Sequence, residues 1–340
     1  MKIHKKLWPI ILSMVAFLTL INSCKKDDAD AQLPILETTA PYHVNCFGAT
    51  CGGNIFSDGG SPVIQRGICI DTDSLQTIAG FRTSDGQGMG YFTTGHQDFL
   101  YPNTTYFVRA YATNVAGTGY GNVLSFKTPG MEILFNPSSP YGSLTDLDNN
   151  VYKTITIGNQ TWMAENLRVT QYNDTTPILL EVREWSYCSS YKLPRYCWQY
   201  NDAIRYKETI GALYNWYAVE TGKLCPSGWH VPSDNEWTVL CNYLGGEEVA
   251  GDKLKETGTT HWFEMNEATN ETGFTAIPCG GRLEGGEFTS IGGFGYWWSS
   301  SFNEDSIPIK RNIYCTNDGV FRYAVNGGYG NSVRCIKDLP

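Results

Sequence analysis

The strongest local signal in the chain is LCPSGWHVPSDNEW, residues 224–237. Ser233 is followed three residues later by Glu236, which is the spacing of a capping box at the start of a helix. Apolar side chains then recur at helical spacing, at Trp237, Leu240, Cys241 and Leu244, and two glycines follow. The pattern predicts an amphipathic helix that begins after Ser233, buries one face and ends at Gly245.

The second half of the chain also carries a clear strand signal. Residues 151–157 alternate apolar and polar side chains, turn at Gly158-Asn159 and continue through residues 160–163, which predicts a β-hairpin. Residues 130–142 are rich in Pro and Ser and predict a linker before this hairpin. Residues 143–340 are therefore expected to form one α+β domain.

The motifs of this domain are, in chain order, WMAENL (162–167), GALYNWYAV (211–219), CPSGWHVPSDNEW (225–237), GYWWSSS (295–301) and SVRCIKD (332–338). They make it similar to the Fibrobacter succinogenes major paralogous domain. The resemblance implies a fold related to the C-type lectins and no shared activity. It also implies a disulfide between the first helix region and the last strand, and Cys225 and Cys335 stand at the matching places. Closing so long a loop would lower the entropy of the unfolded chain and so stabilise the folded state by about 4–5 kcal/mol.

Signals for metal binding and catalysis are weak. Calcium-dependent lectins use Glu-Pro-Asn, Gln-Pro-Asp and Trp-Asn-Asp triplets, and this sequence has none of them. It has no Cys-x-x-Cys or His-x-x-x-His spacing for zinc. His230 lies close to Trp229 and Pro232, where a packed or capping role is favoured over general-base catalysis. We therefore expect no metal, no cofactor and no enzymatic activity.

The first half of the chain predicts a different fold. Short apolar runs separated by Gly, Asn and Asp predict an all-β sandwich over residues 33–129. LYPNTTY (100–106) resembles the E–F corner of fibronectin type III domains, in which the ring of the final Tyr is buried and its hydroxyl bonds the corner backbone. The chain is thus expected to be a fibronectin type III-like all-β sandwich followed by an α+β C-type-lectin-like domain. Such sandwiches serve as spacers or as binding modules.

Eleven cysteines suit an exported chain in which disulfides form. Besides the bridge above, two further pairs are candidates. Cys188 and Cys197 bracket an aromatic segment, and Cys51 and Cys69 are expected on neighbouring strands of opposed sheets. Free structural thiols are the alternative for each pair.

The N-terminus predicts export and lipid attachment. Three lysines precede an apolar run over residues 7–21, which is short for a bilayer span and long enough for a signal-peptide core. Cys24 after Ser23 resembles a bacterial lipobox, so residues 1–23 are expected to be a lipoprotein signal peptide. Residues 24–32 form an acidic tether that resembles the surface-export tag of Bacteroidetes lipoproteins. The alternatives are an ordinary signal peptide and an uncleaved anchor.

The charge of the chain excludes one class of partner. Removal of the leader takes three of the 25 basic residues and none of the 34 acidic ones, which leaves a charge of about −12. Nucleic-acid-binding proteins carry a net basic surface, so no nucleic-acid partner is expected.

These features together predict a non-enzymatic protein of the cell outer membrane, held by a lipid on Cys24 and exposed at the surface. Its lectin-like head is expected to bind a polysaccharide, a glycoprotein or a surface protein. The alternatives are a structural component of an envelope or adhesin assembly and, less favoured, a surface glycan hydrolase. The aromatic side chains proposed to stack on sugars are Trp185, Tyr191, Trp198 and Trp297, although GYWWSSS also has the character of a core strand.

Overall fold

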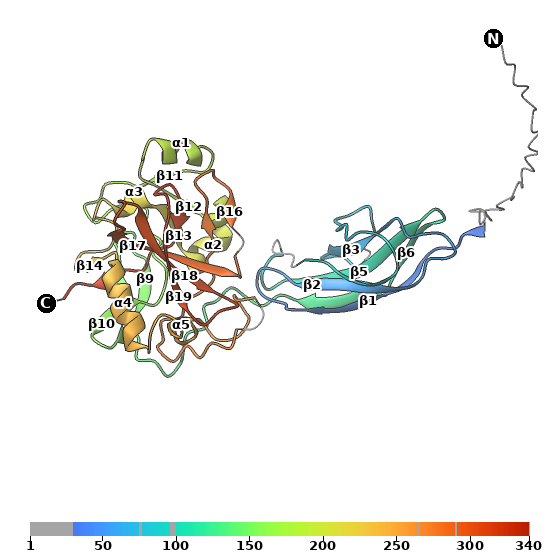
Figure 1. Cartoon of the computed structure of the whole chain (residues 1–340), viewed down its shortest axis with the longest axis horizontal. Coiled ribbons are helices and arrows are strands. Elements are labelled where there is room, and N and C mark those ends of the chain that lie inside the picture. Colours follow the sequence, from blue (N-terminus) through green and yellow to red (C-terminus); the bar gives the residue numbers. More distant parts are fainter. Residues whose placement is uncertain (1–29, 75–76, 96–99, 264–265, 290, 340) are drawn as a thin grey trace, which may run out of the picture.

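The computed structural model describes residues 30–339 apart from 75–76, 96–99, 264–265 and 290. The protein is mostly β, with a slender N-terminal part made of sheets beside a larger C-terminal part of mixed strands and helices (Figure 1). The lipid site expected at Cys24 lies outside the described residues. Within those residues, no helix is both long and apolar enough to cross a membrane.

The N-terminal part consists of two sheets. One contains, in order, β1 (Ile35–Tyr42), β2 (Thr50–Ser57) and β4 (Gly90–Thr93). The other contains β3 (Gln65–Asp71), β5 (Thr105–Asn114) and β6 (Gly117–Tyr120), and β7 (Leu124–Lys127) also pairs with β5. Ile55, Ile68 and Val108 bring the two sheets into one apolar core.

The corner predicted at the start of β5 is present. Tyr106 is buried in the core between the sheets, and its hydroxyl oxygen accepts a hydrogen bond from the backbone nitrogen of Tyr101 at 2.8 Å. A buried phenol needs such a partner, because an unpaired hydroxyl in an apolar core is costly. The bond therefore fixes the path of the chain as it enters β5.

The C-terminal part contains three sheets. The first has the order β14 (Trp229–His230), β21 (Ile336–Lys337), β10 (Gln160–Met163), β9 (Val151–Ile157) and β8 (Gly142–Thr145). The second has the order β11 (Leu179–Leu180), β12 (Arg195–Trp198), β13 (Ala212–Asn215), β20 (Gly330–Asn331), β15 (Gly281–Arg282) and β16 (Phe288–Thr289). The third has the order β17 (Phe294–Phe302), β18 (Pro308–Tyr314) and β19 (Val320–Ala324).

Short helices join and cover these sheets (Figure 1). They are α1 (Trp185–Ser190), α2 (Ala203–Ile210), α3 (Trp216–Val219), α4 (Asp234–Tyr243), α5 (Ala250–Leu254) and the 3₁₀ turn η2 (Gln199–Asn201). The predicted hairpin is β9–β10, which turns at Gly158 with a φ of 62°. Glycine adopts this left-handed conformation without the steric cost that a side chain adds.

Helix α4 begins and ends where the sequence predicts. The Ser233 hydroxyl accepts from the Glu236 backbone nitrogen at 3.2 Å, and the Glu236 carboxylate accepts from the Ser233 backbone nitrogen at 2.7 Å. The predicted apolar stripe, Trp237, Leu240, Cys241 and Leu244, is buried. The capping box and the buried stripe are both confirmed.

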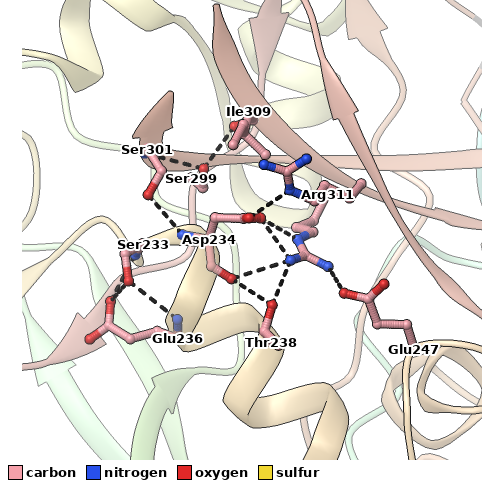
Figure 2. Close-up of polar contacts among 10 residues, drawn as sticks. Ser233, Asp234, Glu236, Thr238, Glu247, Ser299, Ser301, Ile309 and Arg311 are labelled. Atoms are coloured by element: carbon pink, nitrogen blue, oxygen red, sulfur yellow. Dashed lines mark hydrogen bonds and ion pairs between the residues drawn. The ribbon is translucent and has the colours of Figure 1, made fainter. Parts of the chain in front are cut away.

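A buried arginine fastens α4 to the third sheet (Figure 2). Arg311 of β18 is fully buried, and its Nε lies 2.8 Å from Asp234 Oδ1 while its Nη2 donates to the Thr238 hydroxyl at 2.9 Å. It also pairs with Glu247. Asp234 is the first residue of α4, where the partial positive charge at the N-terminus of the helix stabilises its carboxylate.

The family motifs meet around one amide. Oδ1 of Asn166, from WMAENL, accepts from Nε1 of Trp297 at 2.8 Å and from Nε of Arg334 at 2.9 Å. Its Nδ2 donates to the Ile210 carbonyl at 2.8 Å. Three motifs that lie far apart in the sequence are therefore joined by a fully paired buried side chain, which is the condition under which a polar group stabilises a core.

The disulfide predicted between Cys225 and Cys335 is present, with Cα atoms 6.0 Å apart. It joins the segment before α4 to the segment that leads into β21, as the family resemblance implies.

The two other proposed bridges are wrong, because all four cysteines are free. Cys51 packs in the core between the N-terminal sheets, whereas Cys69 points to the opposite face of β3 from its neighbours Ile68 and Ile70, which pack in that core. Sγ of Cys188 lies 3.6 Å from a Glu181 carboxylate oxygen. Cys197 instead packs against Trp185 and Leu213.

The two parts of the molecule meet at a junction around Thr260 and His261, which both the β1–β2 turn and the linker contact. The turn between β1 and β2 enters the C-terminal part. Phe47 is fully buried in the C-terminal core, and the backbone nitrogen of Cys46 donates to the Thr260 carbonyl at 2.9 Å. Core burial of one Phe side chain contributes about 1.5–3 kcal/mol, so this contact is a substantial attachment.

At the same junction, a buried ion pair holds the linker. His261 and Glu256 are fully buried with His261 Nδ1 2.6 Å from Glu256 Oε2. The other oxygen of Glu256 accepts from the Leu134 backbone nitrogen at 2.5 Å, and His261 Nε2 lies 3.2 Å from the Met131 carbonyl. The start of the linker, at Met131 and Leu134, is therefore bound by two charged side chains of the C-terminal part.

Candidate functional site

Three of the four aromatic side chains proposed from the sequence cannot bind a ligand, because they are buried. Trp185 donates to the Gly328 carbonyl at 2.8 Å, and Trp297 donates to Asn166. Trp198 packs in the core with its ring centroid 5.4 Å from that of Tyr196. Each of these indole rings is therefore part of a core and has no face exposed for a ligand.

The fourth proposal, Tyr191, is 64 % exposed at the end of α1. Its ring centroid lies 4.4 Å from that of Tyr187, one helical turn earlier. This pair is accessible, but it stands on a helix of six residues with no buried polar group in the pair itself. It is a smaller apolar surface than the one described next.

One face of the third sheet is lined with aromatic rings. In the register of β17, β18 and β19, Phe294 pairs with Tyr314, Tyr296 with Asn312, Asn312 with Phe321, and Lys310 with Tyr323. Paired residues of neighbouring strands lie on the same face of a sheet. We call this set, together with Tyr329 from the loop before β20, the aromatic face: Phe294, Tyr296, Lys310, Asn312, Tyr314, Phe321, Tyr323 and Tyr329.

The opposite face of the same sheet is closed. Ile309, Arg311 and Ile313 alternate with the residues of the aromatic face along β18, and all three are buried. Arg311 contacts α4 (Figure 2). Ile313 packs in the C-terminal core. The face of Arg311 therefore builds the core, whereas the face of Lys310 is buried at Trp298 and reaches the surface at Phe294 and Tyr323.

The rings of the aromatic face touch one another. The centroids of Phe294 and Tyr296 lie 5.9 Å apart with planes 12° from parallel, and those of Phe294 and Tyr314 lie 5.5 Å apart. Tyr314 continues the series to Phe321 at 5.1 Å. Phe294 is 39 % exposed and Tyr323 is 43 % exposed, so the surface is accessible at both of its sides.

Two buried polar side chains lie in the middle of the aromatic face. Lys310 is 7 % exposed, and its Nζ lies 3.9 Å from the centroid of the Tyr296 ring and 5.6 Å from that of Tyr329. Burial lowers the pKa of Lys310 to about 8, an effect that Cys279 partly opposes. Asn312 is 4 % exposed, and its Nδ2 donates to the Tyr314 hydroxyl at 3.0 Å.

Comparison with known protein families identifies the family of the C-terminal part. The profile of the Fibrobacter succinogenes major domain matches residues 155–337, which is just over half of the chain. The chain belongs to the Fibrobacter succinogenes major domain family. The aromatic face, Arg311 and the Asn166 contacts all lie within the residues of the Fibrobacter succinogenes major domain.

Comparison with solved structures gives only slight likenesses. A myokine structure is 18 % identical and covers 29 % of this chain and 98 % of that chain, with a TM-score of 0.22. The twitchin kinase region from C. elegans is 17 % identical and covers 34 % of this chain and 20 % of that chain, with a TM-score of 0.19. No curated protein matches the chain.

The Fibrobacter succinogenes major domain also contains an exposed charged cluster. His230 Nδ1 lies 2.6 Å from Asp338, and His230 Nε2 lies 2.9 Å from Glu236. Burial alone would lower the pKa of His230, but the hydrogen bonds to Asp338 and Glu236 outweigh it and raise the pKa above its ordinary value. Since Glu236 also forms the capping box, this cluster ties β14 and β21 to the start of α4.

Among the described residues of the Fibrobacter succinogenes major domain, no group of three or more His, Cys, Asp or Glu side chains is arranged to hold a metal ion. The aromatic face contains no carboxylate and no histidine. Its side chains offer ring faces for apolar surfaces, hydroxyl groups for hydrogen bonds and one cation.

Sequence reasoning missed this face, although a signal was present. Phe294, Tyr296 and Trp298 stand at alternate positions, as do Lys310, Asn312 and Tyr314, and then Phe321 and Tyr323. Period-two aromatic runs on three successive strands place their side chains on one face. The GYWWSSS motif was interpreted as core, which holds for Trp297 and Trp298 but not for Tyr296.

Proposed function

We propose that this chain is a non-enzymatic, lipid-anchored surface protein whose Fibrobacter succinogenes major domain binds carbohydrate through the aromatic face. The N-terminal sheets then act as a fibronectin type III-like spacer, and the C-terminal part as a C-type-lectin-like head. Anchoring would use Cys24 in the outer membrane, with residues 24–32 as the tether. The leader sequence and the lipobox-like Ser23-Cys24 pair support the anchor.

The observation that carries the proposal is the aromatic face itself. Sugar rings present patches of C–H groups that pack on aromatic ring faces, where the π electrons attract the partly positive hydrogens. Contiguous rings with hydroxyl groups at their edges suit this ligand better than an apolar protein helix, which would need a groove without polar groups. Lys310 and Asn312 add polar contacts in the middle of the face.

The test is a binding screen of the full-length protein extracted in detergent, against immobilised polysaccharides, mucin and host surface proteins, with and without calcium. A double variant, Phe294→Ala with Tyr323→Ala, removes the two most exposed rings of the set with little effect on folding. Each ring contributes about 0.5–1.5 kcal/mol, so affinity for the bound polysaccharide should fall about fivefold to hundredfold.

Tyr243→Ala is the matched control, because Tyr243 is exposed at the end of α4, which packs on the opposite face of the sheet. It should bind like the unaltered protein. Carbohydrate binding that survives the double variant would remove the aromatic face from the proposal. Recovery of one stoichiometric protein from outer-membrane extract, without any carbohydrate binding, would favour the alternative of a structural component.

A further inference from the structure

We infer that the ligand of the aromatic face is an acidic carbohydrate, whose carboxylate or sulfate group binds Lys310 while its sugar rings lie on the neighbouring aromatic side chains. This inference rests on the proposed function and adds the chemical class of the ligand. It follows from a comparison of the buried cations in this protein.

Buried cations in the described residues have oxygen partners, with one exception. Lys255 lies 2.6 Å from Asp252, and Arg168 pairs with Glu165. Arg311 has the carboxylates described above. Arg282 donates to the carbonyl oxygens of Gly286 and Glu181, and Arg334 donates to those of Phe274 and Thr275.

Lys310 is the exception. Within the described residues its ammonium group makes no hydrogen bond and no ion pair, and its close neighbours are the rings of Tyr296 and Tyr329. A cation over an aromatic ring gains about 0.5–2 kcal/mol. Burial of an unpaired ammonium costs several kcal/mol, so the rings alone leave the charge under-stabilised. An anionic ligand group would supply the missing oxygen acceptor.

The ammonium group is accessible to such a ligand. Some polar side-chain atoms of the described residues are sealed from solvent and have no hydrogen-bond partner. Lys310 Nζ does not belong to this group. Since Nζ has no hydrogen-bond partner, it must retain contact with solvent. The atom is therefore not completely sealed, although the side chain as a whole is only 7 % exposed.

A second unpaired atom lies beside it. Oδ1 of Asn312 is sealed and accepts no hydrogen bond within the described residues, although its amide nitrogen is paired. Asn312 stands two residues after Lys310 on β18, so the two side chains leave the same face about 7 Å apart. One sugar residue spans this distance, and a small rotation of Asn312 would let its oxygen accept from a sugar hydroxyl while the acidic group binds Lys310.

The electrostatic surroundings permit this binding locally. No carboxylate belongs to the aromatic face, and the residues that pair with Lys310 across the sheet are Trp298 on β17 and Tyr323 on β19. The chain as a whole is acidic, with a formal charge of −9. Lys310 is thus the one cation of the aromatic face in a protein of net negative charge, which favours a ligand with a well-placed acidic group over an anionic polymer bound by charge alone.

The test compares three polymers as probes for the full-length protein in detergent: oligogalacturonate for carboxylates, dextran sulfate for sulfates, and neutral dextran. Lys310→Met keeps the length and apolar stem of the side chain and removes the charge. Hydrogen bonds to charged groups of this kind change affinity by about tenfold to hundredfold, so acidic binding should fall by that factor while neutral binding stays unchanged. Lys337→Met, at an exposed position of β21, is the matched control and should change neither.

Asn312→Asp is the second variant, which keeps the test independent of any effect of Lys310→Met on folding. It is almost isosteric and places a carboxylate beside Lys310, which should compete with the acidic ligand and weaken its binding as well. Carboxylate-only or sulfate-only binding that falls in both variants supports the inference and identifies the acidic group. Equal affinity for acidic and neutral polymers, or acidic binding that survives both variants, overturns the inference but leaves the proposed function intact. Binding of none of the polymers removes the proposed function as well.

Discussion

Replacement of Glu256 by Gln should weaken the junction between the two parts of the molecule by about 3–5 kcal/mol, the cost of removing one partner from a buried ion pair. Glu256 and His261 are both fully buried. Burial alone would lower the pKa of His261, but hydrogen bonds with Cys46 and Glu256 and the charge of Glu256 raise it to about 10. The native protein therefore holds a buried imidazolium, which an amide cannot neutralise.

The same pair makes a prediction about pH. Because the pKa of His261 is higher in the folded than in the unfolded protein, the pair contributes its full stabilisation below the unfolded value near 6.5. That contribution falls as the pH rises through the folded value of about 10. The unaltered protein should lose stability between these limits, and Glu256→Gln should show a much shallower loss.

The assay is denaturant unfolding of the full-length protein in detergent at a series of pH values, with limited proteolysis of residues 129–135 as a second probe of the junction. Glu304→Gln, at an exposed loop position, is the control and should stay within about 0.5 kcal/mol of the unaltered protein. A loss below about 1 kcal/mol for Glu256→Gln, or an unchanged dependence on pH, would refute the charged-pair reasoning.

Other expected outcomes concern the C-terminal part alone. Joint replacement of Cys225 and Cys335 by Ser should lower the melting temperature under non-reducing conditions by about 10–20 °C, since the lost loop constraint is worth about 4–5 kcal/mol; a shift below about 3 °C would contradict this. Asn166→Ala should cost more than about 2 kcal/mol in chemical unfolding, because a buried indole and a buried guanidinium lose their shared acceptor; a neutral result would show that water replaces the amide. In an NMR titration the pKa of His230 should lie above its ordinary value and should fall in Asp338→Asn, whereas an unshifted His230 would remove the bond to Asp338 from the account.

Local features of the fold were predictable because they depend on residues near one another in the sequence. The capping box at Ser233, the hairpin turn at Gly158 and the corner at Tyr106 each need only a few neighbouring residues, and the structure contains all three. The Cys225–Cys335 bridge is a long-range contact. It was predictable only through the family resemblance, since spacing alone leaves the partners of eleven cysteines open.

The candidate site was less predictable because exposure depends on packing. Trp is the largest side chain and is as useful in a core as at a binding surface, so sequence alone did not separate Trp185 and Trp297 from exposed rings. The aromatic face needed the strand register of β17, β18 and β19, which is a three-dimensional fact. That Lys310 has no oxygen partner among the described residues could be seen only from the positions of all the oxygen atoms around its ammonium group.

The junction has a consequence for the direction in which a ligand would be met. A domain held by one linker swivels, and its binding surface samples many directions. Here the linker and the Phe47 turn both contact the C-terminal part around Thr260 and His261, and Arg205 of α2 also donates to the Leu100 carbonyl of the N-terminal part. Several contacts spread over two elements of the C-terminal part resist rotation. The aromatic face should therefore keep one heading relative to the long axis of the N-terminal sheets, so that whatever fixes the N-terminal end also sets which way the face looks.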